Sequence, residues 1–206
     1  MHWATYFIAK LADKNIINGY DNFDGTFSFR PDNYITREEY VKVLINTFDL
    51  LKDFDAGNEK TFKDVEEGAW YESFVQCAQA NELIYGIGND LFGVGEYITR
   101  QDMVVLTTRV LEKCCELKLP SDEEIEDRLD FFIDNDEISD YAKIAVAYCN
   151  INEIIIGYET DEGFLFRPHN FITRAEVSKV MIGVLDLMKR AGIPATPGSN
   201  PSHAIE

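Results

Sequence analysis

The sequence predicts a mainly helical, all-α protein built from three helix–loop–helix repeats. The first observation behind this prediction is a spacing. Three times an aromatic residue precedes a glycine by 16 residues, in the pairs Trp3–Gly19, Trp70–Gly86 and Tyr141–Gly157. The second observation is the tripeptide Ile-Thr-Arg, which follows each glycine after a loop of variable length. Two constant blocks separated by a variable loop are typical of a repeated pair of helices.

The block before each glycine is expected to form an amphipathic helix. In the second repeat this block covers residues 70–86, with apolar residues at helical spacing. Because glycine adopts a positive φ without strain, we expect Gly86 to end this helix as its C-cap. The loops at residues 20–34 and 158–171 alternate aromatic residues with Gly, Asp, Asn and Pro, which predicts a turn with a short strand.

The Ile-Thr-Arg tripeptide is expected to open the second helix of each repeat. An acid follows each threonine by three residues, which is the pattern of a capping box, in the pairs Thr36–Glu39, Thr99–Asp102 and Thr173–Glu176. The threonine is then the N-cap, and the arginine takes the first helical position, N1. The apolar residues behind it recur at helical spacing and are predicted to be core, namely Tyr40, Val43 or Leu44, Phe48, Met103, Leu106, Val110, Val177, Val180 or Met181, and Val184.

Neither capping nor packing explains the three arginines, Arg37, Arg100 and Arg174. The helix dipole disfavours a positive charge at N1. One explanation is an anion site, because free N–H groups at a helix start attract anions and an arginine fork suits a carboxylate. The other explanation is a structural salt bridge from each arginine to an acid of the neighbouring repeat, which is plausible at a net charge of −18. The residues alone leave both explanations open.

The composition excludes several classes of function. Lysine and arginine number 19 against 37 aspartates and glutamates, which argues against nucleic acid and against an anionic membrane surface as partners. No apolar run approaches the roughly 20 residues of a membrane span, so no membrane insertion is expected. The sequence has no nucleophile elbow, HExxH motif or P-loop, so we expect neither an enzyme nor a cofactor.

No metal site is expected from the sequence. The loop at residues 20–31 fails the ligand spacing of an EF-hand, and the three histidines are scattered along the chain. The four cysteines lack the CxxC spacing of a zinc site and are expected to be buried free thiols, namely Cys77, Cys114, Cys115 and Cys149.

The motifs taken together resemble S-layer homology domains in three tandem copies. The residues that carry the resemblance are "GYDNFDGTFSFRP", then "ITREE", "ITRQD" and "ITRAE", with "FKDV" at Phe62–Val65 and "FIDN" at Phe132–Asn135 as Phe-x-Asp openings of repeats. The resemblance covers roughly residues 2–188. It implies one pseudo-threefold unit in which the helices after Ile-Thr-Arg form a central three-helix bundle.

We expect the repeats at residues 1–52, which are incomplete at the N-terminal side, and at 61–117 and 131–189. The stretch at residues 121–130 is expected to be a solvated linker with a short helix at most, and residues 190–206 are expected to be a flexible tail toward another module.

The resemblance also implies a function. Such triplets bind secondary cell wall polysaccharide, often bearing ketal-linked pyruvate, and anchor proteins to bacterial cell walls without catalysis. The expected location is therefore extracellular, at the bacterial cell surface, with a signal peptide outside these 206 residues. By resemblance, the ligand site lies in grooves between adjacent repeats, where arginines meet the acidic sugar group beside aromatic walls and glycine backbones. In this sequence, the residues at the matching motif positions, and therefore the expected ligand-binding residues, are Arg37, Arg100, Arg174, Trp3, Trp70, Tyr141, Gly19, Gly86 and Gly157.

This chain departs from the family pattern in several places. The first repeat lacks the Phe-x-Asp opening, so we expect a longer protein whose other modules are partners. Ile87 follows its glycine where the other repeats have Tyr20 and Tyr158, so one or two grooves are expected to be inactive. The alternative function is a repeat scaffold for protein partners or S-layer self-assembly, without a sugar site. For Trp3 and Trp70, the alternative to a groove wall is anchoring of a helix in the core.

Overall fold

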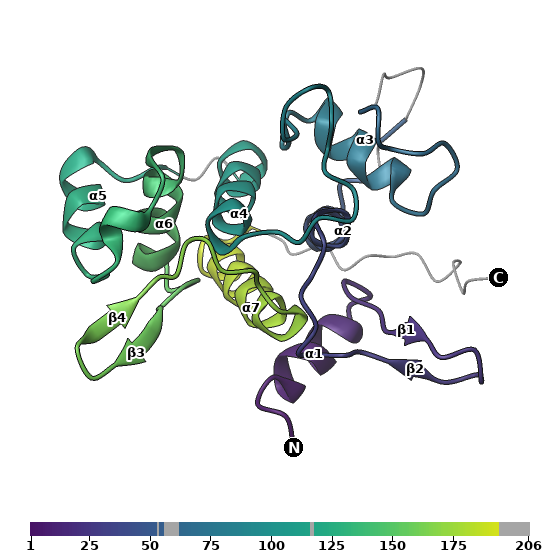
Figure 1. Ribbon diagram of the computed structural model, residues 1–206, viewed down its shortest axis with the longest axis horizontal. Helices are drawn as coiled ribbons and strands as arrows, with labels where there is room; N and C mark the ends of the chain where they lie inside the picture. Colours follow the sequence, from purple (N-terminus) through teal and green to yellow (C-terminus); the bar gives the residue numbers. More distant parts are fainter. Residues whose placement is uncertain (53, 56–61, 116–117, 194–206) are drawn as a thin grey trace.

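The computed structural model describes residues 1–52, 54–55, 62–115 and 118–193, and these residues are mainly helical, as predicted (Figure 1). The α-helices are α1 Thr5–Ala12, α2 Arg37–Thr47, α3 Glu72–Ala80, α4 Arg100–Cys115, α5 Asp122–Leu129, α6 Lys143–Ile151 and α7 Arg174–Arg190. Short 3₁₀ turns are η1 Asn135–Glu137 and η2 Asp140–Ala142. The strands are β1 Tyr20–Asp21, β2 Phe27–Ser28, β3 Tyr158–Thr160 and β4 Gly163–Leu165. Of the tail predicted at residues 190–206, residues 194–206 lie outside the described residues.

The first helix of each repeat ends earlier than predicted. Asn15, Glu82 and Glu153 adopt positive φ and close α1, α3 and α6, four residues before the glycine. In α3 the closing bond runs from Leu83 N–H to the Ala78 carbonyl at 2.8 Å, a Schellman-type pattern. The prediction that Gly86 is the C-cap was therefore wrong, because a polar residue in the left-handed region already ends the helix.

Two of the glycines are needed because other groups approach their backbone closely. A Cβ atom on Gly86 would lie 2.3 Å from the Leu91 carbonyl oxygen, and one on Gly157 would lie 2.8 Å from a ring carbon of Phe132. The loop that follows the glycine forms the predicted short strands in the first and third repeats. There β1 pairs with β2 and β3 with β4, both antiparallel. In the second repeat the shorter loop makes an isolated bridge between Gly88 and Leu91.

The second helices begin as predicted, with arginine at N1. Thr36 and Thr173 form complete capping boxes with Glu39 and Glu176. At the start of α4, the Asp102 N–H donates to Thr99 Oγ1 at 3.2 Å, and this hydroxyl donates to the Asp102 carboxylate at 2.7 Å. All residues of the predicted apolar stripes are buried, which confirms that these stripes are core.

The three Ile-Thr-Arg segments are joined in a closed cycle of backbone hydrogen bonds. The Ile35 N–H donates to the Ile172 carbonyl at 3.1 Å, Ile172 to Ile98 at 3.3 Å, and Ile98 to Ile35 at 3.2 Å. The arginine N–H groups are also bonded between repeats, each at 2.9 Å, from Arg37 to Glu96, from Arg100 to Asn170 and from Arg174 to Asn33. Each helix start is therefore completed by a different repeat.

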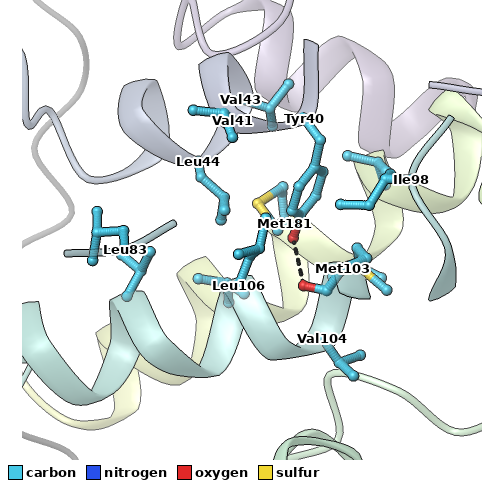
Figure 2. Close-up of a cluster of buried hydrophobic side chains, with 14 of the residues drawn as sticks. Tyr40, Val41, Val43, Leu44, Leu83, Ile98, Met103, Val104, Leu106 and Met181 are labelled. Carbon is cyan, nitrogen blue, oxygen red and sulfur yellow. Dashed lines mark hydrogen bonds between the residues drawn. The ribbon is translucent and has the colours of Figure 1, made fainter. Parts of the chain in front are cut away.

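Helix packing follows the same cyclic order. In Figure 1, α2, α4 and α7 lie at the centre, and α1, α3 and α6 lie around them. Helix α2 packs against α4 and α7, while α3 packs on α2, α6 on α4 and α1 on α7. Figure 2 shows the buried Tyr40 of α2, whose hydroxyl donates to the Met103 carbonyl of α4 at 3.2 Å. Buried side chains from all three repeats belong to one hydrophobic cluster.

Other sequence predictions have mixed outcomes. Helix α5 lies in the stretch predicted as a linker with a short helix at most, has no buried residue, and packs against α6. Cys77 and Cys149 are buried free thiols as expected. The expectation was wrong for Cys114, which is exposed, and for Cys115, which is only partly buried, because both lie in the last turn of α4. Within the described ranges, no helix combines the length and apolar character required to cross a bilayer.

Candidate functional site

The three N1 arginines are buried rather than exposed, and each reaches into the loop of the next repeat in the cycle. Their relative exposure is 9% for Arg37 and 7% for both Arg100 and Arg174. We call the surroundings of each arginine side chain a junction and name the junction after its arginine. In the Arg174 junction the side chain enters the loop of repeat 1, in the Arg37 junction that of repeat 2, and in the Arg100 junction that of repeat 3.

The Arg174 junction holds its guanidinium through several acceptors. Nε donates to the Phe29 carbonyl at 3.0 Å, Nη2 to the Asn18 carbonyl at 2.8 Å and Nη1 to the Tyr20 hydroxyl at 3.1 Å. Nη1 also lies 3.4 Å from Oε1 of Glu39, an acid of another repeat. The salt bridge to an acid of the neighbouring repeat, one of the two explanations that the sequence left open, is therefore present for Arg174.

Tyr20 joins the cation to the capping acid in this junction. Its hydroxyl donates to Glu39 Oε1 at 2.5 Å. Burial, with the hydrogen bond to Glu39, raises the pKa of Tyr20 to about 12, so the phenol stays protonated and keeps donating. The guanidinium carbons of Arg174 and Arg30 lie 4.4 and 4.8 Å from the centre of its ring.

A second cation and an exposed tryptophan lie next to Glu39. The Lys42 ammonium is 5.2 Å from the Trp70 ring centroid and makes no ion pair with any described residue. Burial lowers the pKa of Lys42, and the charge of Arg174 lowers it further, while Glu39 acts in the opposite direction. Trp70 is 52% exposed, so it does not anchor its helix in the core. This arrangement gives a desolvated positive charge beside an aromatic face.

The Arg100 junction has the same tyrosine but a less complete set of hydrogen bonds. Nη1 of Arg100 donates to the Tyr158 hydroxyl at 3.4 Å, and that hydroxyl donates to Glu176. The guanidinium carbons of Arg100 and Arg167 lie 4.7 and 4.4 Å from the centre of the Tyr158 ring. Nε of Arg100 is buried and has no hydrogen-bond acceptor among the residues that the structure describes. Burial lowers the pKa of Arg100. A buried N–H donor without a partner is uncommon and is often found where a ligand or ion binds.

Trp3 belongs to the Arg100 junction by its position in the cycle. It precedes α1, the helix that packs on α7, and Glu176 lies in the first turn of α7. Its exposure is 55%, so Trp3, like Trp70, is at the surface and not in the core.

The Arg37 junction differs from the other two. Nε of Arg37 donates to the Phe92 carbonyl at 2.9 Å. Ile87 stands where the other junctions have tyrosine. The capping acid Asp102 instead accepts from the Tyr141 hydroxyl at 2.8 Å. Burial, with the hydrogen bond to Asp102, raises the pKa of Tyr141 to about 12, and Arg37 acts in the opposite direction. The tyrosine that replaces tryptophan in the third repeat is thus bonded to the acid.

Most amides at the helix starts are already hydrogen-bonded to other repeats and are not free as the sequence suggested. The N1 amides are bonded to other repeats, and the Gln101 and Ala175 amides donate to the Pro168 and Pro31 carbonyls at 3.0 and 2.9 Å. For these five amides, the expectation that free helix N–H groups share a carboxylate with the arginine was wrong, because interlocking of the repeats uses these donors. The side chains remain as candidate anion partners.

The sequence prediction of the ligand site left out five residues that complete these junctions. They are Tyr20, Tyr158, Arg30, Arg167 and Lys42. A signal for four of them was present, because tyrosine follows the glycine and Arg-Pro ends the loop in the first and third repeats and not in the second. Lys42 follows its N1 arginine by five residues, where α7 has Lys179 and α4 has Val105.

Comparison with known proteins identifies the repeats. The family model of the S-layer homology domain matches residues 1–41, 61–104 and 134–178. The exoglucanase XynX of Acetivibrio thermocellus is 28% identical over 90% of this chain and 16% of its own length. A cellulosome-anchoring protein of the same species is 33% identical over 54% of this chain and 24% of its own. The surface-layer 125 kDa protein of Lysinibacillus sphaericus is 25% identical over 95% of this chain and 15% of its own.

These matches concern a small part of each relative. The chain spans 16% of the exoglucanase and 9% of an amylopullulanase from Thermoanaerobacterium thermosulfurigenes. The family, together with the surface-layer, cell surface and anchoring relatives, indicates a cell-surface location and an anchoring module, in agreement with the resemblance. Because the family model covers more than half of the chain in three separate regions, the chain belongs to the S-layer homology domain family.

Proposed function

We propose that this chain anchors a longer surface protein to a bacterial envelope by binding an acidic secondary cell wall polysaccharide, and that it catalyses no reaction. The observation that carries the proposal is the Arg174 junction, where the ammonium of Lys42 lies 5.2 Å from the ring centre of the exposed Trp70 and within the electrostatic influence of the buried Arg174. Burying a cation costs free energy unless an anion lies nearby, so such a cation favours binding of an anion. An exposed aromatic face suits the apolar face of a sugar ring.

The acidic group is a carboxylate of the pyruvate ketal type. In the Arg174 junction, Lys42 pairs with this carboxylate, because it is partly desolvated and has no carboxylate partner among the described residues. Trp70 packs on the sugar ring beside it. The buried Arg174 adds a second positive charge, which already lowers the pKa of Lys42 and becomes favourable once an anion binds. In the Arg100 junction, Nε of Arg100 and the exposed Lys179 are the cationic donors, and Trp3 is the aromatic face.

We further propose that the Arg174 and Arg100 junctions bind and that the Arg37 junction is inactive. The Arg37 junction has Ile87 in place of tyrosine, Gly93 in place of the loop arginine and Val105 in place of lysine. Its aromatic residue, Tyr141, donates its hydroxyl to Asp102. It therefore offers one cation where each of the others offers three.

The net charge of −18 does not prevent binding of an acidic polymer. At physiological ionic strength the Debye length is about 8 Å, so distant acids are screened and the cations of the junction dominate locally.

The arrangement of the three repeats is part of the same proposal. We propose a pseudo-threefold unit of repeats 1–52, 61–117 and 131–189, with α2, α4 and α7 as its central bundle. The closed cycle of hydrogen bonds through Ile35, Ile98 and Ile172 supports it. A chain truncated after Cys115 lacks α7 and Ile172, and with Ile172 two of the three hydrogen bonds of this cycle, so we expect it to unfold or aggregate. A truncated chain that melts cooperatively near the intact temperature would contradict the shared bundle.

Depletion of the protein by purified cell wall polysaccharide tests the function, with the acidic substituents intact or removed chemically. We expect binding only to the intact polymer. Lys42→Met is expected to weaken binding about tenfold, the effect of losing one charge-assisted contact. Val105→Lys in the Arg37 junction is the matched control, and we expect it to leave binding unchanged. A protein that ignores both polymers would favour the scaffold alternative, in which the repeats contact proteins only.

A further inference from the structure

The β1–β2 hairpin of repeat 1 displays a phenylalanine at its closed end. Phe23 is 95% exposed, so its ring makes almost no contact within the monomer. Figure 1 shows the hairpin running outward from the helices, with its closed end far from the central bundle. The corresponding turn between β3 and β4 is formed by Asp161 and Glu162, which are exposed and polar. A hairpin at this place in the repeat therefore does not require an apolar residue at its end.

The backbone of Phe23 is also strained. Its φ is 58°, a left-handed conformation that is unfavourable for a bulky side chain. The other non-glycine residues with positive φ in the described ranges are polar or charged, namely Asn15, Arg30, Asp49, Glu82, Asn89, Asp90, Glu153 and Arg167. Strain and exposure of an apolar ring both cost the monomer free energy. Their combination at one residue is typical of a contact made with another molecule.

The turn holds this ring in one conformation. The Phe23 N–H donates to Oδ1 of Asp21 at 2.7 Å, and the Asn22 N–H donates to the Thr26 carbonyl at 3.0 Å. Oδ1 of Asp24 accepts from the N–H and the hydroxyl of Thr26, at 2.9 and 2.6 Å. These bonds hold the pKa of Asp24 below its usual range, so its carboxylate stays ionised. A ring that is fixed in advance loses less conformational entropy on binding.

The closed end of the hairpin therefore combines an apolar ring with negative charge. Asp21 and Asp24 use Oδ1 within the turn, and among the described residues Oδ2 of neither makes a hydrogen bond. Residues 22–26 contain no lysine or arginine. A complementary surface offers an exposed aromatic ring and a cation that has no carboxylate partner.

The same chain carries such a surface at the Arg174 junction. The Lys42 ammonium lies 5.2 Å from the centre of the Trp70 ring and 5.6 Å from that of Phe74, and it makes no ion pair with any described residue. The hairpin begins at this junction too, because the Tyr20 hydroxyl accepts from Arg174. In Figure 1 the hairpin and α3, the helix that follows Trp70, both lie to the right of the central helices.

A projecting ring and its complementary surface on one side of the molecule suit a two-fold contact. We propose that two copies of this chain form a symmetric dimer by exchanging their β1–β2 hairpin ends. Phe23 of each copy packs on Trp70 of the other, and Asp24 of each copy pairs with Lys42 of the other. Because such a contact is isologous, each interaction occurs twice and assembly stops at the dimer. The dimer covers Lys42 and Trp70, so it competes with polysaccharide at this junction; the competition rests on the proposed function, whereas dimerisation does not.

Sedimentation of the full chain without polysaccharide tests dimerisation. Concentrations from about 1 μM to about 1 mM are compared at physiological ionic strength, where distant acids of the two chains are screened. We expect the parent chain to dimerise with rising concentration. Phe23→Ser should weaken the dimer about a hundredfold, because about tenfold is lost at each of the two contacts. Glu162→Ser in the β3–β4 turn is the matched control and should dimerise like the parent.

Reversal of charge tests which residues pair. Asp24→Lys and Lys42→Glu each place like charges at both contacts, so each variant alone should be monomeric. An equimolar mixture of the two should form a heterodimer, because each of its two contacts again joins opposite charges. Each variant is first checked for native melting. Phe23→Ser, at an exposed position, keeps the proposal testable if Lys42→Glu does not fold.

The outcomes separate the dimer from polysaccharide binding. A parent chain that stays monomeric at about 1 mM overturns the proposal, and the hairpin end then contacts a different protein. A Phe23→Ser dimer as strong as the parent's overturns it as well, and so does a charge-reversed mixture that stays monomeric. A monomeric parent that still binds polymer contradicts only the dimer, while a dimer that ignores polymer contradicts only the proposed function.

Discussion

The Arg174 and Arg37 junctions begin from the same tripeptide and differ in almost every neighbour. Arg174 has two carbonyls, a tyrosine hydroxyl and a carboxylate within 3.4 Å. Arg37 donates through Nε to one carbonyl and lies 5.2 Å from the centre of the Phe92 ring. Both arginines are buried and both occupy N1 of their helices.

The difference teaches that position in the motif does not decide what a repeated residue does. The loop that receives the side chain comes from another repeat, and that loop supplies the tyrosine, the second arginine and the length of the hairpin. One shortened loop and several substitutions change the chemistry around Arg37 without changing its helix. Four predictions test this contrast, beginning with the largest expected effect.

Arg174→Ala is expected to reduce the free energy of unfolding by about 3 kcal/mol, because two carbonyls lose their donor and the Glu39 carboxylate loses its ion pair. Arg37→Ala should cost about 1–2 kcal/mol, since one carbonyl loses its donor and some packing is lost. Urea denaturation of both variants measures the difference. Equal losses would show that the number of hydrogen bonds does not distinguish the two junctions.

Trp70→Ala is expected to weaken polysaccharide binding by about tenfold through loss of the aromatic face. Tyr141→Ala in the Arg37 junction should leave binding within about twofold, because that junction is proposed to be inactive. Both variants must first melt like the parent protein. A larger loss for Tyr141→Ala than for Trp70→Ala would reverse the assignment of the two junctions.

The capping threonines should behave alike in spite of the different loops. Thr36→Ala and Thr99→Ala are each expected to cost about 1 kcal/mol of stability, as for other N-caps, and to leave binding unchanged in the folded protein. Thermal unfolding measures the first effect and polysaccharide depletion the second. If one of these variants lost binding while remaining folded, the helix start itself would belong to the ligand site.

The smallest effect concerns pH and the loop that receives Arg37. Burial raises the pKa of Asp64, but the backbone hydrogen bonds from Phe92, Val94 and Gly93 together outweigh burial and hold this pKa below the ordinary value of an aspartate. A lowered folded pKa means that this aspartate stabilises the protein above its unfolded pKa and loses that contribution as the pH falls through the folded value.

The unfolding free energies of the parent and of Asp64→Asn should therefore differ at neutral pH and converge as the pH falls below about 4. Denaturation at a series of pH values measures this convergence. A difference that stays constant across the series would mean that the charge of Asp64 does not hold the loop.

Much of the local structure could be predicted from the sequence. The Thr-x-x-acid pattern gave correct caps at Thr36 and Thr173, and the apolar period gave a correct core stripe on each second helix. These features depend on residues within one or two turns of each other. The same local reasoning failed at Gly86, because Glu82 already adopts the left-handed conformation that ends the helix.

The sequence by itself determined the number of repeats, the start of each second helix and the place of each arginine at N1. Only the tertiary structure decided that the arginines are buried, that their amides are bonded, and which acceptors surround them. The partners of Arg174 at Asn18 and Tyr20 lie 156 and 154 residues away in the chain. No periodicity in the sequence encodes such a pairing, because it arises when the third repeat closes on the first and the two bury one another's polar groups.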